Sequence, residues 1–135
     1  MLKEAGVRTY CDDRDNYKPG WKFNHWEVKG IPLRLELGKK DYENQEARVV
    51  RRDTGAKIQM KWADMAVEIP KLLEQIQAEM YERAKKVRDD HMIEATNWTE
   101  FMNALNQKDI VLTPWCQENE CEVKAKERSK VESEK

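Results

Sequence analysis

Two spacings of apolar residues limit the folds open to this chain. Four short segments have the alternating or β-rich character of strands, at residues 7–11, 33–37, 47–52 and 57–62. A spacing of three to four residues then takes over between Pro70 and Val87, and it predicts a long helix with a single apolar stripe, Pro70 lying near its first turn. Because strands and helix alternate along the chain, the pattern favours an α/β fold built on a sheet.

Local signals add one further helix and a hairpin. Pro19 is typical of the first helical position, where its missing N–H costs nothing, and Gly30 is expected to end that helix near Lys29. The segment 53–56 contains Gly55, which tolerates positive φ and predicts a tight turn between two strands. A hairpin adds an antiparallel pair, so the sheet is expected to be mixed.

The pattern restarts near residue 91 as a second, incomplete unit. Asn97 is expected to cap a short helix, with Glu100 three residues further on as its partner in a capping box. From Glu122 to Lys135 charges of both signs dominate, which predicts a frayed helix or a disordered segment.

The charge balance and the cysteines exclude several classes of protein. The chain has 25 Lys and Arg against 26 Asp and Glu, so binding to a polyanion must come from a local cluster of positive charge. No apolar run approaches the ~20 residues of a membrane span. An odd count of three Cys behind an N-terminus without a hydrophobic stretch predicts a reduced, cytoplasmic setting. The sequence also lacks a glycine-rich phosphate loop and a Ser/His/Asp set, so no catalytic site is expected within it.

Three groups of motifs follow one another between residues 12 and 55. They are Asp12-Asp13-Arg14-Asp15; Pro19-Gly20-Trp21-Lys22-Phe23-Asn24-His25-Trp26-Glu27 with Lys29-Gly30-Ile31-Pro32-Leu33-Arg34; and Leu35-Glu36-Leu37-Gly38, Lys40-Asp41 and Val50-Arg51-Arg52-Asp53-Thr54-Gly55. In order and spacing they resemble the anticodon-binding domain of the prolyl-tRNA synthetases, in the eukaryotic and archaeal type. The resemblance extends over nearly the whole chain.

The resemblance implies a fold and a division into domains. The implied fold is the α/β fold of class II aminoacyl-tRNA synthetase anticodon-binding domains, a three-layer mixed β-sheet with flanking helices. Residues 1–90 would form this domain without the family's first strand and helix, leaving an open strand edge near 7–11. Residues 91–135 would begin the family's C-terminal domain, an α+β unit with a charged, flexible tail.

The resemblance also implies a function within a larger enzyme. The parent would be the ligase that joins proline to its tRNA in the cytoplasm, using ATP and Mg in a separate catalytic domain and acting as a homodimer. This chain would be non-catalytic, would not contact a membrane and would bind the anticodon loop of tRNA(Pro). A stand-alone accessory module, or a protein-interaction module without ligase activity, is the alternative.

Five residues match the family's anticodon contacts by identity: Phe23, Glu27, Arg34, Lys40 and Asp41. Proline anticodons end in two guanines, and a splayed-out guanine offers two donors on one edge and the O6 and N7 acceptors on the other. A carboxylate and a cation suit these two edges. Phe23 and Glu27 are four residues apart in the predicted helix and so share one face, where an aromatic ring could stack on a base.

Each of the five residues also has a purely structural interpretation. Phe23 is equally compatible with a core position, as is usual for a helical Phe. Glu27 and Arg34 could form an ordinary surface ion pair, and Lys40 with Asp41 a turn with a helix cap.

Four residues lie between Cys116 and Cys121, a spacing within the range of structural zinc sites. A tetrahedral site needs two more ligands, and Cys11 lies on a predicted strand at the other end of the chain. The pair is therefore half of a zinc site at most. Two free thiols without bound zinc are the expected state.

Overall fold

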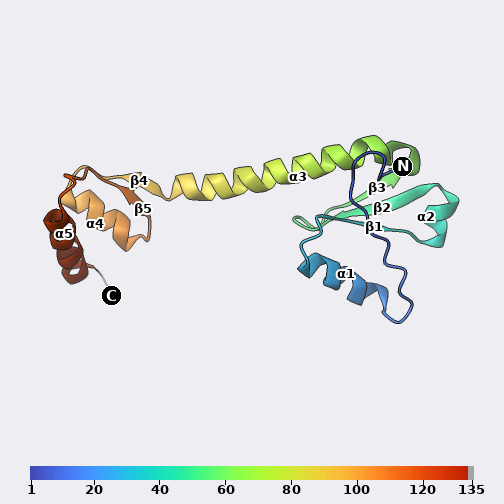
Figure 1. The fold of residues 1–135 in the computed structure, drawn as a ribbon, viewed down its shortest axis with the longest axis horizontal. Helices are drawn as coiled ribbons and strands as arrows, with labels where there is room; N and C mark the ends of the chain where they lie inside the picture. The colour runs from blue at the N-terminus through green and yellow to red at the C-terminus, as the bar shows by residue number, and fades with distance from the viewer. Residues whose placement is uncertain (134–135) are drawn as a thin grey trace. The chain divides into compact units, whose positions relative to one another are not determined.

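The computed structural model describes residues 1–133, and it divides into two compact units, Met1–Tyr81 and Glu82–Lys135. The elements of the first unit, labelled in Figure 1, are α1 (Pro19–Val28), β1 (Leu33–Glu36), α2 (Lys39–Glu43), β2 (Glu46–Arg51), β3 (Lys57–Lys61) and the start of α3 (Trp62–Asp90). The boundary expected after residue 90 stays a prediction.

The first unit is built on a sheet with the strand order β1-β2-β3. Both pairings are antiparallel, and Leu35, Val49 and Ile58 lie in one cross-strand row. The neighbouring row holds Glu36, Arg48 and Gln59. Directly paired residues point to the same side of a sheet, so the first row and the second belong to opposite faces.

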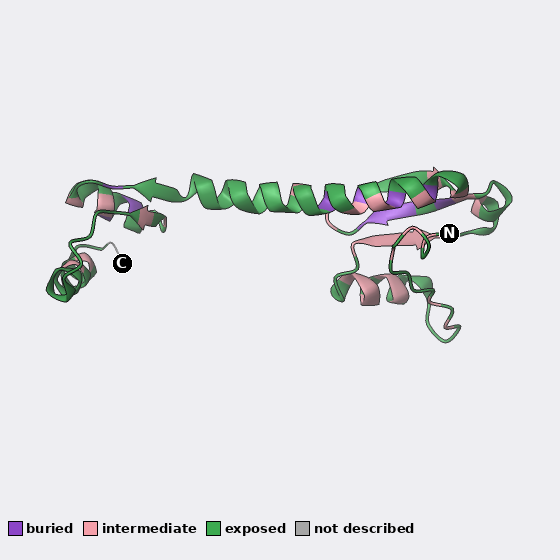
Figure 2. Ribbon diagram, turned by 45° about the horizontal axis from the view of Figure 1, so that its top comes forward, coloured by how far each residue is buried: buried purple, intermediate pink, exposed green. Residues whose placement is uncertain are grey.

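The face that carries Val49 forms the core with α3. Val49 and Ala47 of β2 are buried against Met65, Ile69 and other residues of the first turns of α3. Figure 2 shows this buried layer between β2 and the beginning of α3, with α1 on the other side of the sheet. Helix, sheet and helix make the three layers that the sequence predicts, and the α/β fold class is confirmed.

Three details of the first unit differ from expectation. Among the described residues, segment 7–11 forms no strand, because no neighbouring strand satisfies its backbone groups. The sheet is antiparallel throughout, since each connection between its strands is short enough for a hairpin-like return. The position expected for Pro70 was wrong: α3 begins at Trp62, so Pro70 lies inside the helix, where it has no N–H for the backbone ladder.

The apolar stripe of α3 is buried only in part. Leu72 and Ile76 reach the core, whereas Met80 and Val87 are exposed. Periodicity alone predicted one continuous stripe, but the short sheet covers only the first half of it.

The second unit contains β4 (Met92–Glu94), α4 (Trp98–Asn106), β5 (Ile110–Leu112) and α5 (Asn119–Glu132). β4 and β5 are parallel, with α4 as the connection between them. The predicted cap is confirmed, because the Asn97 side chain accepts a hydrogen bond of 3.0 Å from the Glu100 N–H. The charged segment from Glu122 is helical as far as Glu132, and residues 134 and 135 lie outside the described residues.

Two contacts hold α5 against α4. The Trp98 indole Nε1 donates a 2.6 Å hydrogen bond to Glu132, and the Arg128 guanidinium lies 4.2 Å from the centroid of the Trp98 ring. Within the part of the chain that the structure describes, no helix is both long enough and apolar enough to traverse a bilayer.

Candidate nucleic-acid interface

Three of the predicted residues meet where α1 lies on β1. Arg34 donates from Nη1 to the Glu27 carboxylate and, over 2.9 Å, from Nε to Glu36. Its guanidinium lies 4.2 Å from the centroid of the Phe23 ring. The sequence thus brings an aromatic ring, a cation and a carboxylate into one cluster.

Local structure explains this arrangement. Pro19 begins α1, so Phe23 and Glu27 come one turn apart on the side of the helix that meets the sheet. Arg34 alternates with Leu33 and Leu35, which packs it on the polar side of β1. The Glu27 side chain is 43% exposed and that of Arg34 is 20% exposed, so both reach solvent from this cluster.

Lys40 and Asp41 lie on α2, at another edge of the same sheet. The Asp41 carboxylate accepts 2.9 Å from the backbone N–H of Gly38 and 2.7 Å from the Gln59 side-chain amide. These two donors, Gly38 first, hold the pKa of Asp41 below its usual value. Lys40 is exposed. Among the described residues, no hydrogen bond or ion pair joins this group to Arg34 or Glu27.

The polar sheet face connects the two groups. The row Glu36, Arg48 and Gln59 crosses all three strands between Arg34 on one side and Asp41 on the other. We call the whole surface the recognition face, and it consists of Phe23, Glu27, Arg34, Glu36, Lys40, Asp41, Arg48 and Gln59. Sequence reasoning missed Glu36, Arg48 and Gln59, although alternation within the predicted strands already placed them opposite the core.

The outer side of α1 carries aromatic side chains that stack on one another. Trp21 lies 3.9 Å from Tyr17 and 4.8 Å from His25, measured between ring centroids. The Trp26 indole instead donates 2.8 Å to the Asp12 carboxylate, which also accepts two 2.7 Å bonds from Arg14. The Trp26 bond, together with a 3.0 Å bond from Lys22 to the Asp12 backbone carbonyl, binds the 12–15 segment to α1.

The two cysteines near α5 are both exposed, and their thiols contact each other. The Glu118 N–H, followed by the Cys121 thiol, lowers the pKa of Cys116, and contact with Cys116 raises that of Cys121. Within the described residues, no cluster of three or more His, Cys, Asp and Glu side chains could hold a metal ion. Two thiols alone do not fit a four-ligand zinc site.

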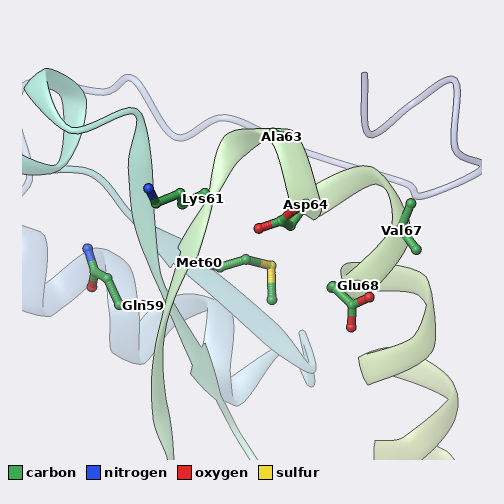
Figure 3. Close-up of a pocket in the computed structure, with 7 residues that line it drawn as sticks. All are labelled: Gln59, Met60, Lys61, Ala63, Asp64, Val67 and Glu68. Carbon is green, nitrogen blue, oxygen red and sulfur yellow. The ribbon is translucent and has the colours of Figure 1, made fainter.

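A shallow pocket lies where β3 passes into α3 (Figure 3). It is lined by Gln59, Met60, Lys61, Ala63, Asp64, Val67 and Glu68. Figure 3 shows that the Gln59 side chain extends to the opposite side of β3 from Met60 and Asp64. The greater part of this pocket therefore belongs to the α3 side of the sheet and not to the recognition face.

Comparison with known proteins gives two family matches. The model for the anticodon binding domain matches residues 1–72, more than half of the chain. The chain belongs to the anticodon-binding domain family. The model for the prolyl-tRNA synthetase C-terminal domain matches residues 98–133, within the second unit.

Whole-chain relatives agree with both matches. Over 132 residues the chain is 48% identical to the cytoplasmic proline–tRNA ligase of Arabidopsis thaliana, covering 98% of this chain and 25% of that protein. It is 52% identical over 125 residues to the bifunctional glutamate/proline–tRNA ligase of Drosophila melanogaster, covering 93% of this chain and 7% of that one.

A solved structure is similar throughout. Prolyl-tRNA synthetase from Cryptosporidium parvum, complexed with L-proline and AMP, matches with a TM-score of 0.89 at 42% identity, covering 98% of this chain and 28% of that one. This anticodon-binding domain is therefore of the prolyl-tRNA synthetase type, as the motifs between residues 12 and 55 indicated. The chain spans about a quarter of the Arabidopsis ligase.

Proposed function

We propose that this chain recognises the anticodon loop of tRNA(Pro) through its recognition face. The observation that carries the proposal is the Glu27–Arg34 pair supported by Phe23. A carboxylate and a guanidinium side by side are complementary to the donor edge and the acceptor edge of a guanine. An unpaired guanine can therefore satisfy both side chains at once.

The contacts follow from the atoms that remain available. Glu27 bonds Arg34 through Oε1, so its second oxygen can accept from guanine N1–H and N2–H. Arg34 uses Nε and Nη1 for Glu36 and Glu27, which leaves the remaining guanidinium N–H groups for O6 and N7. Phe23 supports the plane of the guanidinium and limits its rotation. Phe23 thus acts in recognition without needing to stack on a base itself.

Lys40 and Asp41 would complete the site at the other edge of the sheet. Lys40 is an exposed cation suited to a phosphate or to a guanine acceptor edge. Phosphate contacts supply affinity, whereas base contacts supply the preference for guanine.

The whole protein would be a proline–tRNA ligase, with this chain as its non-catalytic part. ATP and Mg would act in the parent's separate catalytic domain, and the parent would be a cytoplasmic homodimer. Residues 1–90 would be the anticodon-binding domain and residues 91–135 the beginning of the C-terminal domain. Cys116 and Cys121 would supply at most half of a zinc site, so no step of this proposal uses that metal.

Fluorescence anisotropy of a labelled anticodon stem-loop tests the proposal at low salt. The natural loop with two guanines is compared with one in which both become adenine. We expect the full chain to bind the natural loop at least several-fold more tightly, and Glu27→Ala and Lys40→Ala to remove most of that preference. Equal binding of both loops by the folded chain would contradict the proposal and favour an accessory or protein-interaction module.

A further inference from the structure

Gln59 lies on the recognition face, and none of the RNA contacts proposed above uses its side chain. It lies on β3, paired directly with Arg48 of β2, and Arg48 is paired with Glu36 of β1. The side chain leaves β3 on the side opposite the pocket residues Met60 and Asp64 (Figure 3). Gln59 therefore projects from the sheet on the side that carries Arg34.

The Gln59 amide is held in place from one side only. Its Nε2 donates a 2.7 Å hydrogen bond to Asp41 Oδ1. A side-chain amide has two N–H donors and a carbonyl oxygen with two lone pairs. One N–H is used by Asp41, so a second N–H and the carbonyl oxygen remain for a ligand.

Asp41 is itself fixed by the backbone. Its other oxygen, Oδ2, accepts 2.9 Å from the Gly38 N–H at the start of α2. Both carboxylate oxygens thus have a protein partner, one on α2 and the other on β3. An exposed Gln side chain normally loses conformational entropy when it binds a ligand. The hydrogen bond to a fixed Asp41 already restricts the Gln59 side chain, so less entropy is lost on binding.

An amide that bonds a carboxylate through the N–H trans to its oxygen keeps the cis N–H and the carbonyl oxygen side by side, and such a pair matches the edges of nucleobases. An in-plane amide can make two hydrogen bonds to an unpaired base that presents a neighbouring donor and acceptor. Arg48, exposed on the adjacent strand, adds a positive charge beside this position.

We infer that Gln59 contacts a further unpaired base of the same RNA loop, next to the two guanines, and that Asp41 is a positioning residue that orients the Gln59 amide toward it. The inference rests on the proposed function. It adds a base contact by Gln59 at this edge, with Asp41 orienting the Gln59 amide.

Stem-loops with an abasic site test this inference. One stem-loop has the natural loop, and two others lack the base on the 5′ or the 3′ side of the guanine pair. We expect the full chain to bind one abasic loop about 3- to 10-fold more weakly than the natural loop. Gln59→Ala should bind the natural and that abasic loop equally, while keeping the preference for guanines over adenines.

Asp41 variants separate positioning from contact. Asp41→Ala should reduce the natural-to-abasic ratio in the same way as Gln59→Ala, because the amide loses its orientation. Asp41→Asn retains an oxygen that can accept from Gln59 and should preserve most of the ratio. Gln77→Ala changes an exposed glutamine on α3 and serves as the matched control with an unchanged ratio.

Three results would overturn the inference. Gln59→Ala could leave the abasic contrast intact, or it could weaken all loops equally, which would show that Gln59 only holds α2 against the sheet. If the wild-type chain prefers guanines but binds both abasic loops as tightly as the natural one, the inference fails while the proposed function stands. If the chain shows no preference for guanines at all, the proposed function fails first.

Discussion

Replacing Arg34 by lysine distinguishes recognition by a planar fork from attraction by a positive charge. In the structure the guanidinium bonds Glu27 and Glu36 through different nitrogens and lies on the Phe23 ring. A lysine ammonium is a single point donor on a flexible stem and cannot reproduce these contacts together with two bonds to one guanine. Arg34→Lys therefore keeps the positive charge but loses the planar, forked arrangement of N–H donors.

The size of the effect follows from the contacts that disappear. A bidentate contact to a guanine edge contributes roughly 1–3 kcal/mol of discrimination, or about 5- to 150-fold. Glu27 remains and still accepts from the other edge, so part of the preference survives. We therefore expect Arg34→Lys to lower the guanine-to-adenine preference by about 10-fold. The salt dependence of binding should remain unchanged, because the number of cations near the phosphates is the same.

Anisotropy titrations of the guanine and adenine stem-loops at several salt concentrations measure both quantities. Arg34→Ala should lower the preference at least as far, because it removes the charge as well as the fork. Arg128→Lys, an exposed arginine of the second unit, is the control and should change neither. If Arg34→Lys is folded by circular dichroism and keeps the wild-type preference within about twofold, then the fork geometry of Arg34 does not carry recognition.

Three further changes test other parts of the structure. Arg48 is an exposed cation on the recognition face, and we expect it to contact RNA phosphates. Arg48→Ala should therefore weaken binding of all stem-loops about equally and lower the salt slope by about 1 in the same titrations; a selective loss for one loop would contradict this role. Ile69→Ala empties a core position that is 1% exposed and should lower the free energy of unfolding of the first unit by about 2–5 kcal/mol in urea titrations, whereas Val67→Ala, on the exposed side of α3, should change it little. The Arg14 guanidinium lowers the pKa of Asp12, so this carboxylate stabilises the fold above its unfolded pKa of about 3.9 and loses that contribution as the pH falls through its lower folded value. Asp12→Asn should therefore unfold more readily than the wild type at pH 7, and this difference should shrink as the pH falls below about 3.9. A difference that stays constant over that range would refute the assignment.

Much of the recognition face could be predicted from the sequence because it depends on local spacing. A four-residue separation puts Phe23 and Glu27 on one side of α1, and alternation puts Arg34 on the polar side of β1. The capping pair Asn97 and Glu100 was predictable for the same reason, since both partners lie within one helical turn. Lys40 and Asp41 were predicted from their match to the family. Local spacing alone fits both anticodon recognition and a helix cap.

Local patterns failed where the outcome depends on a distant partner. Segment 7–11 has the alternation of a strand, yet a strand exists only when another strand satisfies its backbone groups. Val87 continues the apolar stripe of α3, yet burial requires a surface to cover it, and the three strands reach only as far as Ile76. Pro70 marks a helix start in isolation, but the contacts of Met65 and Ile69 with β2 extend α3 to earlier residues.

The sequence by itself determined most of the helices and strands, which side of each is polar, and which family the chain resembles. Only the tertiary structure decided that Arg34 joins Glu27 to Glu36, and that Gln59 of β3 holds Asp41 of α2. The physical reason is the range of the interactions: helical and strand periodicity act within a few residues, whereas the register of β1, β2 and β3 brings together side chains up to 18 positions apart, as in the Gln59–Asp41 hydrogen bond.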